Sequence, residues 1–159
     1  MAKKLKFSDW LTNQISNISK EKSAILVTFN TNTDLEITEA WVQKKIPFDT
    51  VGRKIGNGFS LSNDGTVVAS SDVKRFRATV GVRLLESYSV DVYPRIYSES
   101  GASWYTDSGY QKSTTQIRNE TVDTCVNNKN IYATLSSSRT GTVKLRGDFA
   151  YTYMLVEEL

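Results

Sequence analysis

Residues 76–84 read Phe-Arg-Ala-Thr-Val-Gly-Val-Arg-Leu, and this stretch decides the fold class. Every even-numbered position is apolar, whereas the odd-numbered positions hold arginine, threonine, glycine and arginine. Side chains of a β-strand alternate between the two faces of a sheet. The stretch therefore predicts a strand with one face in a core and the other facing outward.

The same period of two continues on both sides of this stretch. Strands are expected at residues 23–29, 35–37, 40–42, 59–61, 66–69, 88–93, 131–135 and 143–156. Asn63-Asp64-Gly65 is a strong hairpin signal, because such turns favour residues that tolerate positive φ. The glycine-rich residues 52–58 are expected to form a loop. We therefore predict an all-β body, an antiparallel jelly-roll sandwich of about ten short strands.

The first 22 residues have a different pattern. Residues 8–19 predict a short helix, with Ser8 as its N-cap and with Leu11, Ile15 and Ile18 at spacings of four and three. A helix of about a dozen residues is marginal in water, so it should dock on the body or associate with copies of itself. Trp10 lies beside the apolar stripe and is a candidate anchor.

The sequence thus predicts two parts. Residues 1–22 form an N-terminal helical anchor or trimerisation stub, and residues 23–159 form a β jelly-roll head domain. A tail that frays and packs loosely is the alternative for the first part.

Composition removes several classes of chemistry. The 159 residues contain no histidine and one cysteine, Cys125, which excludes Ser-His and Cys-His nucleophiles, most zinc sites and any disulfide framework. Cys125 is expected to be a small buried hydrophobe. We expect no catalytic residue, no metal and no cofactor.

Charge and hydropathy limit the partners. Five lysines and two acids fall in residues 1–22, so the whole formal charge of +3 lies there and the head is neutral. A neutral body is a poor match for nucleic acid. No apolar run reaches the roughly 18 residues that a membrane helix needs, and polar residues interrupt any signal-type segment after the basic start. We expect neither nucleic-acid binding nor membrane insertion.

The closing stretch has apolar or aromatic residues at both odd- and even-numbered positions. Residues 149–156 read Phe-Ala-Tyr-Thr-Tyr-Met-Leu-Val, so a strand there has two faces to bury. Phe149, Tyr151 and Tyr153 are candidates for a subunit interface, where tyrosines are common. The alternative is a central strand that a loop or the N-terminal helix covers.

A second candidate site lies where the alternation is lost, between residues 98 and 118. Trp104, Tyr105, Asp107 and Tyr110 place aromatic rings beside a short acceptor, which is how sugar rings and protein partners are bound. Equally, Trp104 could fold back as a lid over one end of the sandwich.

Two further groups are interpreted as solvated surface. The carboxylates Asp34, Glu36 and Glu39 could in principle serve a glycosidase, but Glu36 lies between Leu35 and Ile37 and should point outward. The second group is basic and comprises Lys74, Arg75, Arg77 and Arg83. Arg77 and Arg83 lie at the odd-numbered, polar positions of one predicted strand.

The order of these segments resembles a known family. Residues 46–51, 58–67 and 76–82 resemble the first half of a complement-head or tumour-necrosis-factor-like jelly roll, and residues 151–156 are similar to its last strand. The resemblance covers residues 23–159. It implies a homotrimer with that last strand inside it. Bacterial viruses use such heads in fibres and decoration proteins, with a short stub that attaches to the virion.

We therefore expect a non-enzymatic bacteriophage virion structural protein. It would be a homotrimeric head fibre, decoration or tail-associated protein, made in the bacterial cytoplasm and joined to other virion proteins through its stub. Adhesion and host recognition, through a surface glycan or protein, would be its further role. A monomeric carbohydrate-binding module is the alternative, and a small carboxylate-dependent glycan hydrolase is the second alternative.

Overall fold

The computed structural model describes residues 22–85, 91–98, 103–104, 117–124, 129–148 and 150–159. Within these residues all regular structure is β, in thirteen strands. The strands are β1 (Ala24–Thr28), β2 (Thr33–Ile37), β3 (Lys44–Lys45), β4 (Thr50–Ile55), β5 (Phe59–Leu61), β6 (Val67–Ala69), β7 (Arg75–Val82), β8 (Val92–Ser98), β9 (Ser103–Trp104), β10 (Ile117–Thr124), β11 (Asn130–Ser137), β12 (Gly141–Leu145) and β13 (Tyr153–Glu158).

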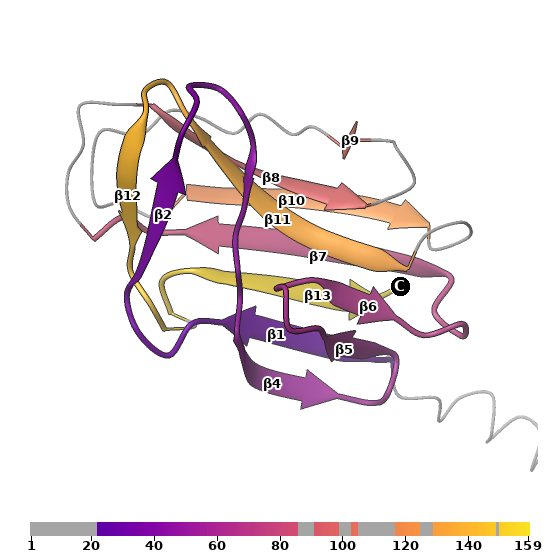
Figure 1. The fold of residues 1–159 in the computed structure, drawn as a ribbon. Helices are drawn as coiled ribbons and strands as arrows, with labels where there is room; N and C mark the ends of the chain where they lie inside the picture. Colours follow the sequence, from indigo (N-terminus) through magenta and orange to yellow (C-terminus); the bar gives the residue numbers. More distant parts are fainter. Residues whose placement is uncertain (1–21, 86–90, 99–102, 105–116, 125–128, 149) are drawn as a thin grey trace, which may run out of the picture.

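The strands form a two-layer sandwich (Figure 1). One sheet has five strands in the order β10-β7-β13-β1-β4. The facing sheet has the order β5-β6-β11-β8-β9, with β3 paired to β11 as its sixth strand. Strands β2 and β12 form a separate two-stranded sheet at one end, on the left in Figure 1. The paired strands run antiparallel, so the predicted all-β antiparallel sandwich is confirmed.

The core lies between the two main sheets and follows the alternation of the sequence. On β7, all four even-numbered residues from Phe76 to Val82 are buried, whereas Arg75 and Arg77 are exposed. The facing sheet contributes Ile131 and other apolar residues of β11. The period of two in residues 76–84 therefore identified the core face correctly.

The predicted hairpin is also confirmed. Strands β5 and β6 are antiparallel neighbours, and the chain turns between Ser62 and Thr66. Gly65 has a φ of 83°, and a Cβ atom there would come within 2.7 Å of the Phe48 backbone nitrogen. Only glycine satisfies both conditions without strain.

The loop expected at residues 52–58 is wrong in its first part. Strand β4 continues to Ile55 and pairs along β1, and the turn starts at Gly56, whose φ is 64°. β4 is the end strand of its sheet, and Gly52, Arg53 and Lys54 are exposed. An exposed edge strand has no apolar alternation for sequence analysis to detect.

The strand expected at residues 40–42 is wrong as well. Trp41 lies in a turn with a φ of 68°, and β3 starts only at Lys44. A left-handed residue cannot be part of a regular β ladder, so the ladder with β11 begins beyond it, at Lys44.

The single strand expected at residues 143–156 is two strands. β12 pairs with β2, and β13 belongs to the five-stranded sheet. Between them, the Asp148 carbonyl accepts hydrogen bonds from the backbone nitrogens of Tyr151 (2.9 Å) and Thr152 (3.1 Å). Asp148 has a φ of 88°, and Gly147 lies so close to Thr31 that a Cβ would come within 2.4 Å of its carbonyl oxygen. This turn sends the chain from one sheet to another.

Candidate functional site

Strand β13 lies near the middle of the five-stranded sheet, between β7 and β1. Met154 and Val156 face the core and are fully buried, whereas Tyr153 and Leu155 lie on the outer face and are partly exposed. The closing strand is therefore apolar on both faces, as the sequence predicts. Its outer face is the candidate site.

The neighbouring strands extend this apolar face. Leu155 lies opposite Leu26 of β1 on one side and Thr79 of β7 on the other. Ala24 lies opposite Ile55 of β4. A shallow groove of about 310 Å³ runs over these strands, and its lining comprises Ala24, Ile25, Leu26, Arg53, Ile55, Leu155 and Glu157. Leucine side chains thus form the middle of the outer face.

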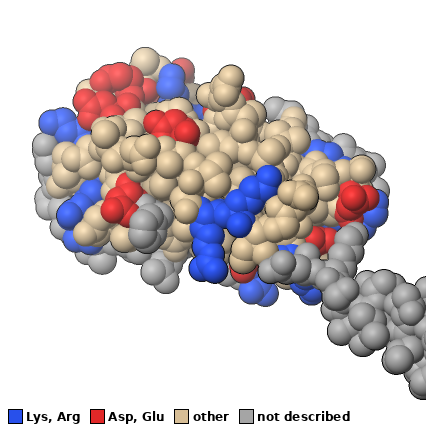
Figure 2. All heavy atoms as spheres, turned by 90° about the horizontal axis from the view of Figure 1, so that it is seen from below, with Lys and Arg blue, Asp and Glu red and all other residues tan. Residues whose placement is uncertain are grey.

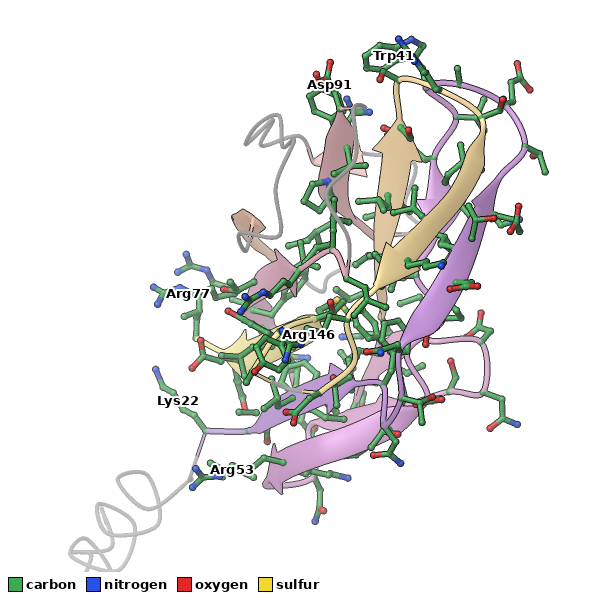
Figure 3. All side chains as sticks on the ribbon, turned by 90° about the vertical axis from the view of Figure 1, so that its left-hand side faces the viewer. Lys22, Trp41, Arg53, Arg77, Asp91 and Arg146 are labelled. Carbon is green, nitrogen blue, oxygen red and sulfur yellow. The ribbon has the colours of Figure 1, made fainter. Side chains whose placement is uncertain are left out.

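Charged side chains surround this groove. Arg53 and Glu157 are part of its lining, and Glu157 lies opposite Arg77 of β7. Lys22, Arg53 and Arg77 project from the same side of the molecule (Figure 3). Seen from below, basic side chains gather in the middle of the view among uncharged residues, with separate acidic groups beyond them (Figure 2). An apolar centre with a charged rim is the usual composition of a protein interface.

Tyr151 does not lie on this strand. It belongs to the turn before β13, and two guanidinium groups lie over its ring, those of Arg83 (4.9 Å from the ring centre) and Arg146 (3.9 Å). Cation–π contacts of this kind hold the ring at the end of the sheet. Arg83 was expected to be solvated, but it is half-buried and its Nε has no hydrogen-bond partner.

Several predicted site residues lie outside the described residues. They are Trp10, Leu11, Ile15 and Ile18 of the stub, Tyr105, Asp107 and Tyr110 of the aromatic segment, Phe149 and Cys125. Trp104 lies on β9, where it is paired with Ile96 of β8. The ligand-binding and anchoring roles of these residues stay predictions.

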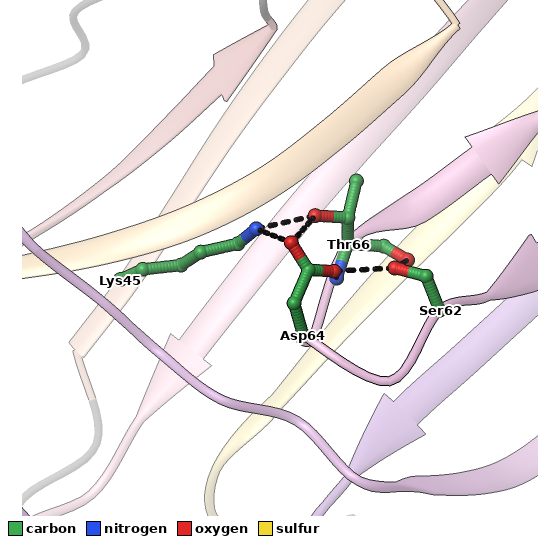
Figure 4. Close-up of polar contacts among 4 residues, drawn as sticks. All are labelled: Lys45, Ser62, Asp64 and Thr66. Atoms are coloured by element: carbon green, nitrogen blue, oxygen red, sulfur yellow. Dashed lines mark hydrogen bonds and ion pairs between the residues drawn. The ribbon is translucent and has the colours of Figure 1, made fainter.

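A polar cluster at the β5–β6 hairpin was missed by the sequence analysis (Figure 4). Lys45 Nζ donates to Asp64 Oδ2 at 2.5 Å and also to Thr66 Oγ1. Ser62 Oγ donates to Asp64 Oδ1 at 2.5 Å. The hydrogen bond from Lys45, followed by those from Ser62 and Thr66, holds the pKa of Asp64 far below its ordinary value. The turn signal marked Asp64, but Lys45 is 19 residues away and gave no signal.

The carboxylates considered for hydrolysis lie on the surface. Asp34, Glu36 and Glu39 are exposed, and Glu36 accepts a hydrogen bond from Thr142 Oγ1. The outward orientation expected for Glu36 is confirmed. In the described part of the chain, no three His, Cys, Asp or Glu side chains gather as a metal site would require. No helix in that part is long and apolar enough to span a membrane.

The fold and the site geometry define a class of protein, the two-sheet β jelly roll. No protein-family model and no curated protein sequence matches the chain. Among solved structures it is similar to murine APRIL at pH 8.5, with a TM-score of 0.65 and 11% identity over 87% of this chain and 100% of that one. It is also similar to Eiger TNF from S. frugiperda, with a TM-score of 0.50 and 6% identity over 86% and 91% of the two chains. The chain therefore has a tumour-necrosis-factor-like jelly-roll fold.

Proposed function

We propose that the protein is a non-enzymatic head that assembles as a homotrimer through the outer face of the five-stranded sheet. The observation that carries this proposal is the half-exposed pair Leu26 and Leu155, which lie opposite each other in the middle of that face. A second surface that covers these leucine side chains would remove their apolar area from water and so stabilise the assembly. The sequence resemblance supports the same face, because it implies a last strand inside a trimer.

We further propose that this trimer is a fibre, decoration or tail-associated head on a bacteriophage virion. The support is the basic, amphipathic segment 1–22 together with the jelly-roll body, a combination that suits a stub attached to a particle. Deleting residues 1–22 should abolish incorporation into particles and leave the head folded. A deletion variant that still enters virions would contradict the anchoring role.

The assembly is tested by mass and by one substitution in the face. Light scattering of the full chain at micromolar concentration should give three times 17.9 kDa. Leu155→Glu places a carboxylate in the centre of the apolar face, where burial of an unpaired charge is costly. We expect this variant to be monomeric, with a circular dichroism spectrum equal to that of the wild type.

A matched control distinguishes the effect of a new charge at the interface from the effect of a new charge elsewhere on the surface. Val42→Glu makes the same kind of change at a residue that is 49% exposed and lies outside the five-stranded sheet. It should stay trimeric. A wild-type chain with the mass of one copy would remove the trimer and leave the monomeric carbohydrate-binding module as the better interpretation.

The hydrolase alternative has its own assay. Cell-wall polysaccharides incubated with the protein would release reducing ends if a carboxylate pair such as Asp34 and Glu36 cleaved them. We expect no release.

A further inference from the structure

The opposite face of the sandwich, on the outside of the six-stranded sheet, carries a row of aromatic side chains. Strand β11 buries Ile131, Ala133 and Leu135 in the core, so Tyr132, Thr134 and Ser136 point to the other side of the sheet, where Tyr132 is half-buried and Thr134 and Ser136 are buried. Tyr132 of β11 lies opposite Tyr97 of β8, and two rows further along, Ser136 lies opposite Tyr93. Both tyrosines of β8 therefore belong to the outer face.

The rings form two pairs. Tyr97 and Tyr132 are stacked, with centroids 5.7 Å apart and planes 11° apart. Trp41 and Tyr93 have centroids 5.5 Å apart, with planes tilted by 41°. Because Tyr93 and Tyr97 are four residues apart on one strand, about 13 Å separates the two pairs. We call Trp41, Tyr93, Tyr97 and Tyr132 the aromatic strip.

Trp41 is held in place at a cost in backbone energy. Its φ of 68° is left-handed, which is strained for a bulky residue, and its N–H donates to the Ser137 carbonyl at 2.7 Å. Yet its side chain is 57% exposed, so core packing does not explain the strain. It projects at one end of the molecule, on the same end as Asp91 (Figure 3). Strained residues of this kind cluster at functional sites.

Hydrogen-bonding side chains lie between and beside the rings. Gln43 Oε1 accepts from Thr134 Oγ1 at 2.6 Å, and Gln43 Nε2 is buried without a hydrogen-bond partner. Arg95 and Lys45 both lie opposite Thr134, in the row between the two aromatic pairs. Lys45 also lies 4.8 Å from the centre of the Tyr132 ring and is paired with Asp64. The strip thus alternates aromatic faces with polar groups.

This arrangement fits the chemistry of a sugar chain. A pyranose ring has an apolar C–H face that packs on an aromatic face, and its hydroxyls accept and donate hydrogen bonds around the edge. A protein partner would need a larger close-packed apolar centre, whereas Val42 is the one large aliphatic residue near the strip that is exposed in the described part. Lys45 is already neutralised by Asp64, so Arg95 is the remaining cation in the row between the two aromatic pairs, whereas a glycan with an acidic group on each ring would require one cation for each ring.

We propose that the aromatic strip binds a neutral oligosaccharide, with one sugar ring on each aromatic pair. The inference rests on the proposed binding role of the head but not on its trimeric state. The strip and the proposed subunit face lie on opposite outer surfaces of the sandwich, so a trimer would display three strips outward. Three linked sites would raise the avidity for a polymeric glycan.

The test uses the full chain on an array of neutral hexasaccharides, namely those of glucose, mannose, galactose and N-acetylglucosamine in their common linkages. The wild type should bind at least one of them. Trp41→Gly removes one ring without imposing a left-handed φ on a side chain, and Tyr97→Ala removes a ring from the other pair. Each variant should bind the same sugar about fivefold more weakly, because a ring contact contributes about 1 kcal/mol.

A control variant and measurements of the molecular mass test this inference independently of the proposed trimer. Tyr151→Ala removes a ring at the end of the other sheet and should leave sugar affinity unchanged. A monomeric wild type that still binds sugar would contradict the trimer and support the strip. A trimer that binds no neutral sugar, that binds acidic glycans alone, or whose affinity is unchanged in both strip variants would overturn the inference. If Trp41→Gly changed the assembly from trimer to monomer and the wild type bound no sugar, the strip would instead be a protein contact.

Discussion

At the scale of single residues, the Lys45–Asp64 pair makes stability depend on pH. Lys45, Ser62 and Thr66 favour the charged form of Asp64, so its folded pKa lies below the value of about 3.9 in an unfolded chain. A depressed carboxyl pKa stabilises the fold above the unfolded value, and this stabilisation is lost as the pH falls toward the folded pKa.

Asp64→Asn should therefore lower the urea midpoint at pH 7, and the difference from the wild type should shrink below about pH 4. Urea denaturation at pH 7, 5 and 3 measures it. Asp34→Asn, an exposed carboxylate outside the cluster, is the control. Equal midpoints of Asp64→Asn and wild type at pH 7 would show that the pair contributes nothing.

The backbone strain at Trp41 is measurable with two substitutions. Both Trp41→Gly and Trp41→Ala remove the ring, but only alanine keeps a Cβ at a φ of 68°. The glycine variant should be more stable than the alanine variant by about 1 kcal/mol in urea titrations. The opposite order would mean that the left-handed conformation relaxes once the ring is gone.

At the scale of elements, the β5–β6 hairpin depends on one glycine. Gly65→Ala faces both a positive φ and the backbone of Phe48 at 2.7 Å. Gly141→Ala faces a φ of 131° but no atom within 4 Å, so it is a matched control for conformation alone. Gly65→Ala should cost about 1–3 kcal/mol more than Gly141→Ala in thermal or urea unfolding, the usual penalty of overpacking. Similar losses would show that the hairpin shifts to accept a methyl group.

Elements with one buried face could be predicted from the sequence, and elements set by distant contacts could not. β7 alternates because one of its faces lies in the core. The division between β12 and β13 depends on the close approach of Gly147 to the Thr31 backbone, and these residues are more than 100 positions apart. Likewise, Tyr132 and Tyr97 meet only through the pairing of β11 with β8. The outer apolar face of β13 was visible in the sequence because it needs no distant partner to be recognised.

At the scale of the whole molecule, the proposed trimer would couple stability to protein concentration. If the folded state is a homotrimer and the unfolded state is a single chain, mass action raises the Tm with protein concentration. Calorimetry over a hundredfold range of concentration should show a rising Tm for the wild type. The Tm of Leu155→Glu should stay constant. A constant Tm in both proteins would contradict coupled folding and assembly.

The exposed edge strand β4 has a consequence for crowding of many copies, as on the proposed particle. An open strand edge can recruit another chain and begin a fibril, and positively charged side chains on the edge oppose this by repulsion. Arg53 and Lys54 are both exposed on β4. Replacing both with threonine should promote thioflavin-positive aggregation at millimolar concentration, where the native chain stays clear. The two cations on this short edge strand would thus allow many copies to lie side by side without forming fibrils.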